Sequence, residues 1–268
     1  MDQKQLEMRN VILYFSHKYN GNWHAIYRAI KTREKTDIET TFEVASKIKS
    51  KTSTILDDDY PNSLKKMSNP PFVIYYYGNL SLLDDKTIFA IWGDENGSAK
   101  IRQLSETMAI EINQQNRVLT VIDGALNDSI AYAAADYGGV IAVGIAGIEY
   151  VKSQHNELSK ENIINLLLSE FPGMIEPDYS RKLATTRLVS ALSTNMIVTD
   201  LAIGSYLLNG IIHNLENGKR VFIMDNAAKQ SKEIKKVVKQ LDLIEIQNIK
   251  EVQYIIEAAQ GKVHKSLS

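Results

Sequence analysis

From residue 72 onward, short apolar runs alternate with longer amphipathic stretches, and this rhythm restricts the fold more than any other feature. The runs are apolar along most of their length, which is typical of strands with both faces covered. Strands are expected at FVIYYYG (72–78), TIFAIW (87–92), RVLTVI (117–122), VIAVGI (140–145), INLLLSEF (164–171), NMIVTDL (195–201), KRVFIMD (219–225) and LIEI (243–246). Helical patterns separate most of them. The sequence therefore predicts an α/β fold with an extended, Rossmann-like, doubly wound and mostly parallel sheet.

The first 71 residues follow a different pattern. Residues 1–56 show helical spacing, with a break at Gly21 and with Asp37 placed to cap the helix after it. Residues 57–71 contain three prolines and begin with three consecutive aspartates, which we interpret as a solvated turn and not as a metal-binding loop. We expect a small helical N-terminal domain (1–56), a linker (57–71) and a Rossmann-like domain (72–268).

The composition and motifs of the chain argue against several kinds of catalytic and metal-binding site. The chain has no cysteine, and its five histidines are scattered without metal-ligand spacing. Neither a P-loop nor a serine nucleophile elbow is present. We therefore expect a protein that is not an enzyme and that needs no cofactor or metal. No apolar run has membrane-spanning length, so we expect no membrane association and a cytoplasmic location. The formal net charge is −1, so phosphate binding requires a local cationic cluster.

The loop 93–98, after the strand TIFAIW, has two interpretations. Ligands bind beyond the carboxyl ends of parallel strands, so backbone N–H groups at Gly93 and Ser98, with Lys100 nearby, form a candidate phosphate site. Asp94 and Glu95 in the same loop repel an anion. We favour the second interpretation, in which this acidic pair caps the positive end of the following helix and no anion binds.

The segment SRKLATTR (180–187) carries the most concentrated positive charge in a predicted ligand loop. Arg181, Lys182 and Arg187 precede or open a predicted helix at RLVSALS. They are candidates for contacts with a phosphate backbone, and ordinary solvated charges at a helix start are the alternative. Gly204 and Ser205 are expected to add backbone and hydroxyl donors to the same edge of the sheet.

Several stretches, in this order, resemble the DNA-processing protein A (DprA/Smf) family. They are YPNSLKKMSNPPFVIYYYG (60–78), IAVGIAG (141–147), LLSEFPG (167–173), TRLVSALS (186–193), GSYLL (204–208) and GKRVFIM (218–224). The resemblance implies an extended Rossmann fold behind a small helical domain. It also implies a non-catalytic protein that binds single-stranded DNA, forms a homodimer and helps to load a RecA-type recombinase during recombination or natural transformation.

The departures from the family pattern lie in the ligand loops. Asp94 and Glu95 follow the first-loop glycine, where the family continues through Ser or Thr to Arg. The second loop opens with Asp123 and Gly124 in place of Ser-Gly, which leaves Gly124 as its candidate phosphate contact. Of an Arg-Asn-Arg segment only Arg187 remains.

Three functions are consistent with these residues. The first is a DprA-like protein that binds single-stranded DNA. The second is a scaffold that keeps the fold and the protein partners of the family and has lost DNA binding. The third, based on fold analogy, is a sensor or enzyme for a small nucleotide.

Overall fold

The computed structural model of the protein describes residues 2–85, 87–94, 97–155, 164–228 and 231–259. Within them, a nine-stranded sheet runs in the order β1-β2-β6-β5-β4-β3-β7-β8-β9. The pairs from β6 to β9 are parallel, whereas β1–β2 and β2–β6 are antiparallel. The strands are β1 (Lys51–Thr54), β2 (Val73–Gly78), β3 (Ile88–Trp92), β4 (Arg117–Ile122), β5 (Val140–Gly144), β6 (Leu166–Ser169), β7 (Asn195–Val198), β8 (Arg220–Met224) and β9 (Ile244–Ile246). The expected Rossmann-like, mostly parallel sheet is confirmed.

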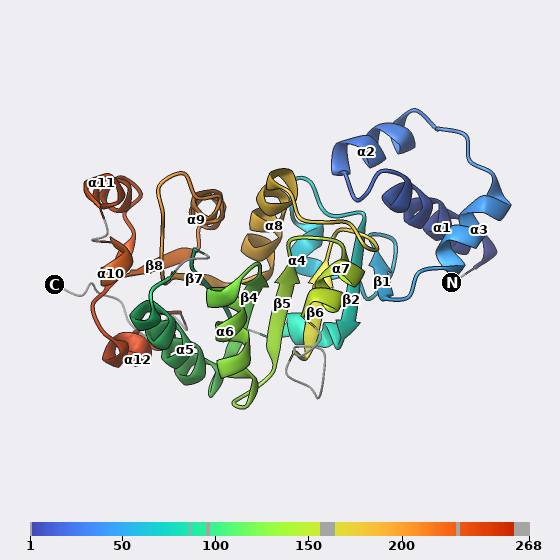
Figure 1. Ribbon diagram of the computed structural model, residues 1–268. Helices are drawn as coiled ribbons and strands as arrows, with labels where there is room; N and C mark the ends of the chain where they lie inside the picture. Colours follow the sequence, from blue (N-terminus) through green and yellow to red (C-terminus); the bar gives the residue numbers. More distant parts are fainter. Residues whose placement is uncertain (1, 86, 95–96, 156–163, 229–230, 260–268) are drawn as a thin grey trace.

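Helices cover both faces of this sheet (Figure 1). One face packs against α4 (Asn62–Lys65), α8 (Tyr179–Leu192), α9 (Leu207–Glu216) and α11 (Lys232–Gln240). The other packs against α5 (Ala99–Asn113), α6 (Ala125–Ala135), α7 (Ile148–Gln154) and α12 (Val252–Ala259). The short helix α10 (Asp225–Ala228) follows β8, and the 3-10 helices η1 (Leu80–Asp84) and η2 (Ile249–Glu251) lie in connections.

Side chains alternate between the two hydrophobic clusters along each central strand. Tyr75 belongs to the cluster on the α5–α6 face, and its neighbour Tyr76 belongs to the cluster on the α8–α9 face. Trp92 is 1% exposed and lies in the α8–α9 cluster, where its ring meets that of Tyr206 edge-on. These aromatic residues are therefore core residues and are not available to stack on a ligand.

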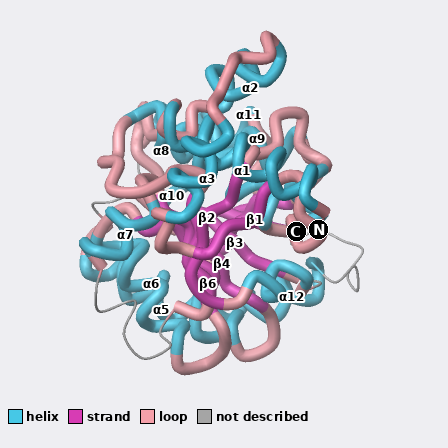
Figure 2. Tube along the Cα trace, turned by 90° about the vertical axis from the view of Figure 1, so that its right-hand side faces the viewer, coloured by secondary structure: helices cyan, strands magenta, loops and turns pink. Residues whose placement is uncertain are grey.

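Three helices, α1 (Gln3–Lys18), α2 (Trp23–Lys31) and α3 (Ile38–Ser46), gather at the β1 end of the sheet (Figures 1 and 2). As expected, Asp37 caps α3, accepting a hydrogen bond from the backbone N–H of Thr40 at 2.8 Å. Ile12 and Leu13 of α1 are buried in the same cluster as β2 and β4. Helix α1 thus shares a core with the sheet, whereas the buried residues of α2 form a separate small cluster with Phe15.

One local expectation was wrong. Residues 51–54, expected within the helical segment, form β1, which pairs with β2 at the edge of the sheet. The aspartates after it lie in the expected turn, with Asp58 and Asp59 exposed. In addition, Asp57 forms an ion pair with Arg9 at 3.0 Å and Asp59 accepts a hydrogen bond from Ser53 at 2.7 Å. The division into domains at residues 56 and 71 stays a prediction. No helix among the described residues is both long enough and apolar enough to cross a bilayer.

Gly78 provides a test of how tightly β2 and β6 approach each other. Its φ of +102° is strained for other residues, and a Cβ there would lie 2.1 Å from the carbonyl oxygen of Asn165. We expect Gly78→Ala to lower the free energy of unfolding by more than about 2 kcal/mol, measured by urea denaturation. Gly218, with φ of +69° and open space around its Cβ position, is the matched control and should lose about 1 kcal/mol as Gly218→Ala. Equal losses would contradict the close approach.

Candidate nucleic-acid interface

The carboxyl ends of β4, β3 and β7 form the central part of the predicted ligand edge. From β3 the chain continues through β4, β5 and β6 on one side of the sheet, and it later returns to β7, β8 and β9 on the other. Ligands of doubly wound folds bind at such a switch point. The backbone N–H of Asp94 donates to the carbonyl of Asp200 at 3.3 Å, so the loops after β3 and β7 touch there.

Each of these three strands is followed by an aspartate. Asp94 follows β3, Asp123 follows β4 and Asp200 follows β7. Asp200 is 5% exposed, and both its burial and the neighbouring carboxylate of Asp94 raise its pKa above the ordinary value. The local potential at this edge therefore disfavours a further negative charge. Among the residues that the structure describes, no group of His, Cys, Asp or Glu is arranged to hold a metal ion.

Asp94 binds hydrogen-bond donors of the turn 202–205. Its two carboxylate oxygens accept hydrogen bonds from the hydroxyl of Ser205, at 2.6 Å, and from the backbone N–H of Ala202. Gly204 lies in this turn with φ of +77°. The Ser205 hydroxyl also accepts from the backbone N–H of Leu207, which fixes the start of α9. The turn 202–205 is therefore held by an internal carboxylate.

The capping role expected for Asp94 was consequently wrong. The helix after the first loop is α5, and its N-cap is Ser98, whose hydroxyl accepts from the backbone N–H of Ile101 at 3.3 Å. Asp94 binds the loop after β7 instead, 108 to 111 residues away in the chain. Glu95, the other half of the acidic pair, lies outside the described residues.

Gly93 is buried and fully hydrogen-bonded. Its N–H donates to the side-chain oxygen of Asn127 at 3.0 Å, and its carbonyl accepts from the Asn127 amide at 2.8 Å. A Cβ at position 93 would lie 2.5 Å from the hydroxyl oxygen of Thr199. This glycine therefore serves the packing of β3 against its neighbours, and its N–H does not face a ligand.

The remaining residues of the first two loops are more accessible. Ser98 and Lys100 are exposed at the start of α5. Gly124 is half-buried and stands at the N-cap position of α6. The hydroxyl of Tyr206 donates to the carboxylate of Asp123, the residue before Gly124. Ser98, Lys100 and Gly124 thus stay predicted phosphate contacts.

The predicted cationic segment is helical throughout, since α8 begins at Tyr179 and not near residue 187. Arg187 therefore lies within the helix, where its guanidinium binds the carboxylate of Glu170 and the carbonyl of Asn69. Glu170 is 5% exposed, and its burial raises its pKa while Arg187 opposes that shift. Because a buried charge requires a partner, Arg187 is committed to this ion pair.

Arg181 and Lys182 differ in their surroundings. Arg181 pairs with the carboxylate of Asp178, the N-cap residue of α8, and its guanidinium lies 5.8 Å from the centre of the Phe171 ring. Lys182 lies with its ammonium 5.3 Å from the centre of the Tyr206 ring, so it faces the loop edge. Of the three predicted cations, Lys182 is the one that the structure places beside the turn 202–205.

Sequence reasoning did not anticipate three of these partners. Glu170 lies within the strand expected at 164–171 and is buried, but its ion pair with Arg187 was missed. Asn127 and Tyr206 were missed because ordinary helix residues give no signal of a contact across the sheet. For the contact between Tyr206 and Asp123, the sequence offers one signal, which is the position of Asp123 directly after an apolar strand.

The sheet order and its loop edge define a Rossmann-like α/β protein. The family model described as DNA recombination-mediator protein A matches residues 51–257. The chain therefore belongs to the DNA recombination-mediator protein A family, which confirms the resemblance to DNA-processing protein A. The matched region begins at the first residue of β1 and includes every strand of the sheet.

Individual relatives agree with this assignment. DNA processing protein DprA of Bacillus subtilis (strain 168) is 27% identical over 175 residues, which cover 64% of this chain and 59% of that protein. The same protein of Streptococcus pneumoniae (strain ATCC BAA-255 / R6) is 27% identical over 175 residues, covering 63% and 61%. The match thus spans about three fifths of the length of these relatives.

Two solved structures share the fold. DNA processing protein A from Helicobacter pylori, described for its single-stranded DNA binding mode, gives a TM-score of 0.68 at 20% identity and covers 80% of this chain and 98% of that chain. DNA processing protein A (DprA) from Streptococcus pneumoniae also gives a TM-score of 0.68, at 19% identity, and covers 94% and 95%.

The Arg187–Glu170 ion pair leads to a stability prediction. Removing one partner of a buried pair leaves the other charge uncompensated, which costs about 3–5 kcal/mol. We expect Arg187→Met to lower the free energy of unfolding by that amount in urea denaturation. The double variant Arg187→Met/Glu170→Met should recover most of the loss, because no buried charge remains. A single variant as stable as the parent would show that the pair is not buried in solution.

Proposed function

We propose that this protein is a non-catalytic accessory of DNA recombination that binds single-stranded DNA at the carboxyl edge of its sheet. The observation that carries this proposal is the family match, which covers the whole sheet. The fold likeness to a DNA processing protein A described for its single-stranded DNA binding mode supports it. The family resemblance also motivates two partners, a RecA-type recombinase and a second copy of this chain.

Within that edge, the phosphate contacts proposed for this chain are few. Lys182 supplies a positive charge beside the turn 202–205, and Ser98, Lys100 and Gly124 lie at the starts of neighbouring helices. Arg181 and Arg187 contribute less than their charges suggest, because Asp178 and Glu170 already bind them. We therefore expect weak binding that depends strongly on salt, with Kd values in the micromolar range or above.

A second candidate is a scaffold that keeps the family fold and its protein partners without DNA. One observation favours it: the carboxylate of Asp94 occupies the N–H and hydroxyl donors of the turn 202–205. A carboxylate can satisfy such donors permanently, and it repels an arriving phosphate. Under this function the oligonucleotide affinity is negligible even at low salt.

Oligonucleotide titration at two salt concentrations separates the two candidates. We expect single-stranded DNA to bind at low salt, and Lys182→Glu to weaken binding and to lower the slope of log K against log salt by about one unit. Lys236→Glu is the control, since Lys236 is an exposed lysine of α11 with the same change in charge. If the parent does not bind at low salt, the DNA proposal fails and the scaffold function stands.

A change at Asp94 is expected to strengthen DNA binding, whereas Lys182→Glu is expected to weaken it. Asp94→Asn removes one negative charge from the edge and keeps an oxygen that can accept from Ser205 or Ala202. We expect this variant to bind single-stranded DNA several-fold more tightly at low salt, with the gain shrinking as salt screens the edge. Glu245→Gln, an exposed carboxylate of β9, is the control. An unchanged affinity would place the DNA elsewhere.

A further inference from the structure

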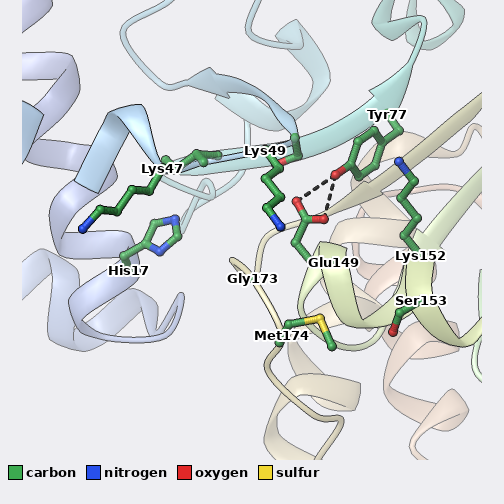
Figure 3. A pocket seen from close by; sticks show the side chains of 11 residues that line it. His17, Lys47, Lys49, Tyr77, Glu149, Lys152, Ser153, Gly173 and Met174 are labelled. Carbon is green, nitrogen blue, oxygen red and sulfur yellow. Dashed lines mark hydrogen bonds between the residues drawn. The ribbon is translucent and has the colours of Figure 1, made fainter. Parts of the chain in front are cut away.

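A pocket of ≈ 590 Å³ lies between the N-terminal helices and the α7 side of the sheet (Figure 3). One wall comes from α1 and from the segment between α3 and β1. The other comes from the end of β2, from α7 and from the loop after β6. The lining residues that matter here are His17, Lys49, Tyr77, Glu149, Lys152 and Met174. None of these six is among the residues proposed above to contact DNA.

Positive charge dominates this pocket. Three lysines and one glutamate line it, which gives a formal charge of 3 − 1 = +2. Lys47 pairs with Glu43 on the surface of α3 and points away from the other lysines in Figure 3. Lys49 and Lys152 form no ion pair with any residue that the structure describes. Two ammonium groups are therefore available to an anion.

Tyr77 and Glu149 lie between these two lysines (Figure 3). The Tyr77 hydroxyl donates to both carboxylate oxygens of Glu149, at 2.7 and 2.8 Å, so this carboxylate already has a donor. The ammonium of Lys152 lies 3.7 Å from the centre of the Tyr77 ring, a cation–π contact that holds the side chain in place. Lys152 is thus ordered before any ligand arrives, which lowers the entropic cost of binding.

The rest of the pocket offers apolar and aromatic surface. Met174 is 62% exposed beside Gly173, which has φ of +59° and holds the loop in its turn. His17 lies on the opposite wall, and its buried Nε2 has no hydrogen-bond partner in the described part of the chain. Burial lowers the pKa of His17, so the ring is neutral near pH 7. This apolar and neutral surface suits a flat, weakly polar group.

We propose that this pocket binds a nucleoside phosphate. Its volume is that of a small-molecule site and not of an extended groove. Lysine ammonium groups bind phosphate as point charges, and Lys49 and Lys152 supply two of them. The apolar surface of Met174 and the imidazole of His17 receive the base. This site is separate from the proposed DNA edge and does not rest on DNA binding.

The ligand would touch both halves of the molecule, because the walls belong to the N-terminal helices and to the sheet. Binding to the folded state alone raises the apparent stability by mass action. A nucleoside triphosphate present at one hundred times its Kd should therefore raise Tm by several degrees. Adenosine without phosphate should produce a much smaller shift, since it leaves both ammonium groups without a partner.

Isothermal titration with ATP, ADP and adenosine tests the proposal. We expect the full chain to bind ATP and ADP, and Lys49→Ala/Lys152→Ala to weaken that binding at least tenfold. Glu149→Gln should tighten it, because the change removes the one carboxylate of the pocket and keeps an oxygen for the Tyr77 hydroxyl. Lys235→Ala/Lys236→Ala on α11, far from the pocket, is the matched control and should bind as the parent does (Figure 1).

The same variants distinguish this site from the DNA edge. We expect Lys49→Ala/Lys152→Ala to bind a single-stranded oligonucleotide as the parent does, whereas Lys182→Glu leaves ATP binding unchanged. The proposal is overturned if ATP binds no better than adenosine, or if the double lysine variant binds ATP normally. It is also overturned if that variant loses only oligonucleotide binding, since the pocket would then belong to the DNA path.

Discussion

Both faces of the central strands have to be covered, and the rest of the structure follows from this requirement. Residues of β3, β4, β5 and β7 are buried on the two sides of the sheet, in two separate hydrophobic clusters. Parallel strands cannot be joined by tight turns, so each connection carries a helix back across one face. The loops at the carboxyl edge are the product of that geometry, and loops of this kind generally vary more in sequence than the strands they connect.

Internal carboxylates bind several of the donors and cations near this edge. The donors of the turn 202–205 bind Asp94, the guanidinium of Arg187 binds Glu170, and Arg181 binds Asp178. Each contact stabilises the apo protein, and a phosphate would have to displace it or add to its negative charge. The electrostatic character of this edge therefore differs from that of a strongly basic groove.

The sequence predicted the strands of the parallel sheet because burial on two faces leaves long apolar runs. The opposite orientations of the adjacent residues Tyr75 and Tyr76 follow from the same assignment, since side chains alternate along any strand. The sequence did not predict strand β1, because its residues KTST are few and polar, as those of edge strands often are. It could not predict the Asp94–Ser205 contact, because 111 residues separate the two and only the strand order brings them together.

The way α1 is attached has a consequence for partial unfolding. Arg9 forms an ion pair with Asp57 and donates to the hydroxyl and carbonyl oxygens of Thr52, so it binds the chain on and just after β1. Ile12 and Leu13, one turn further on, are buried against β2. The helix cannot detach without uncovering Val73 and Tyr75, so α1, β1 and β2 form one cooperative opening unit. Amide protons of the β1–β2 pair should exchange with solvent at the same rate as those of α1, although 32 residues of sequence lie between the end of α1 (Lys18) and the start of β1 (Lys51).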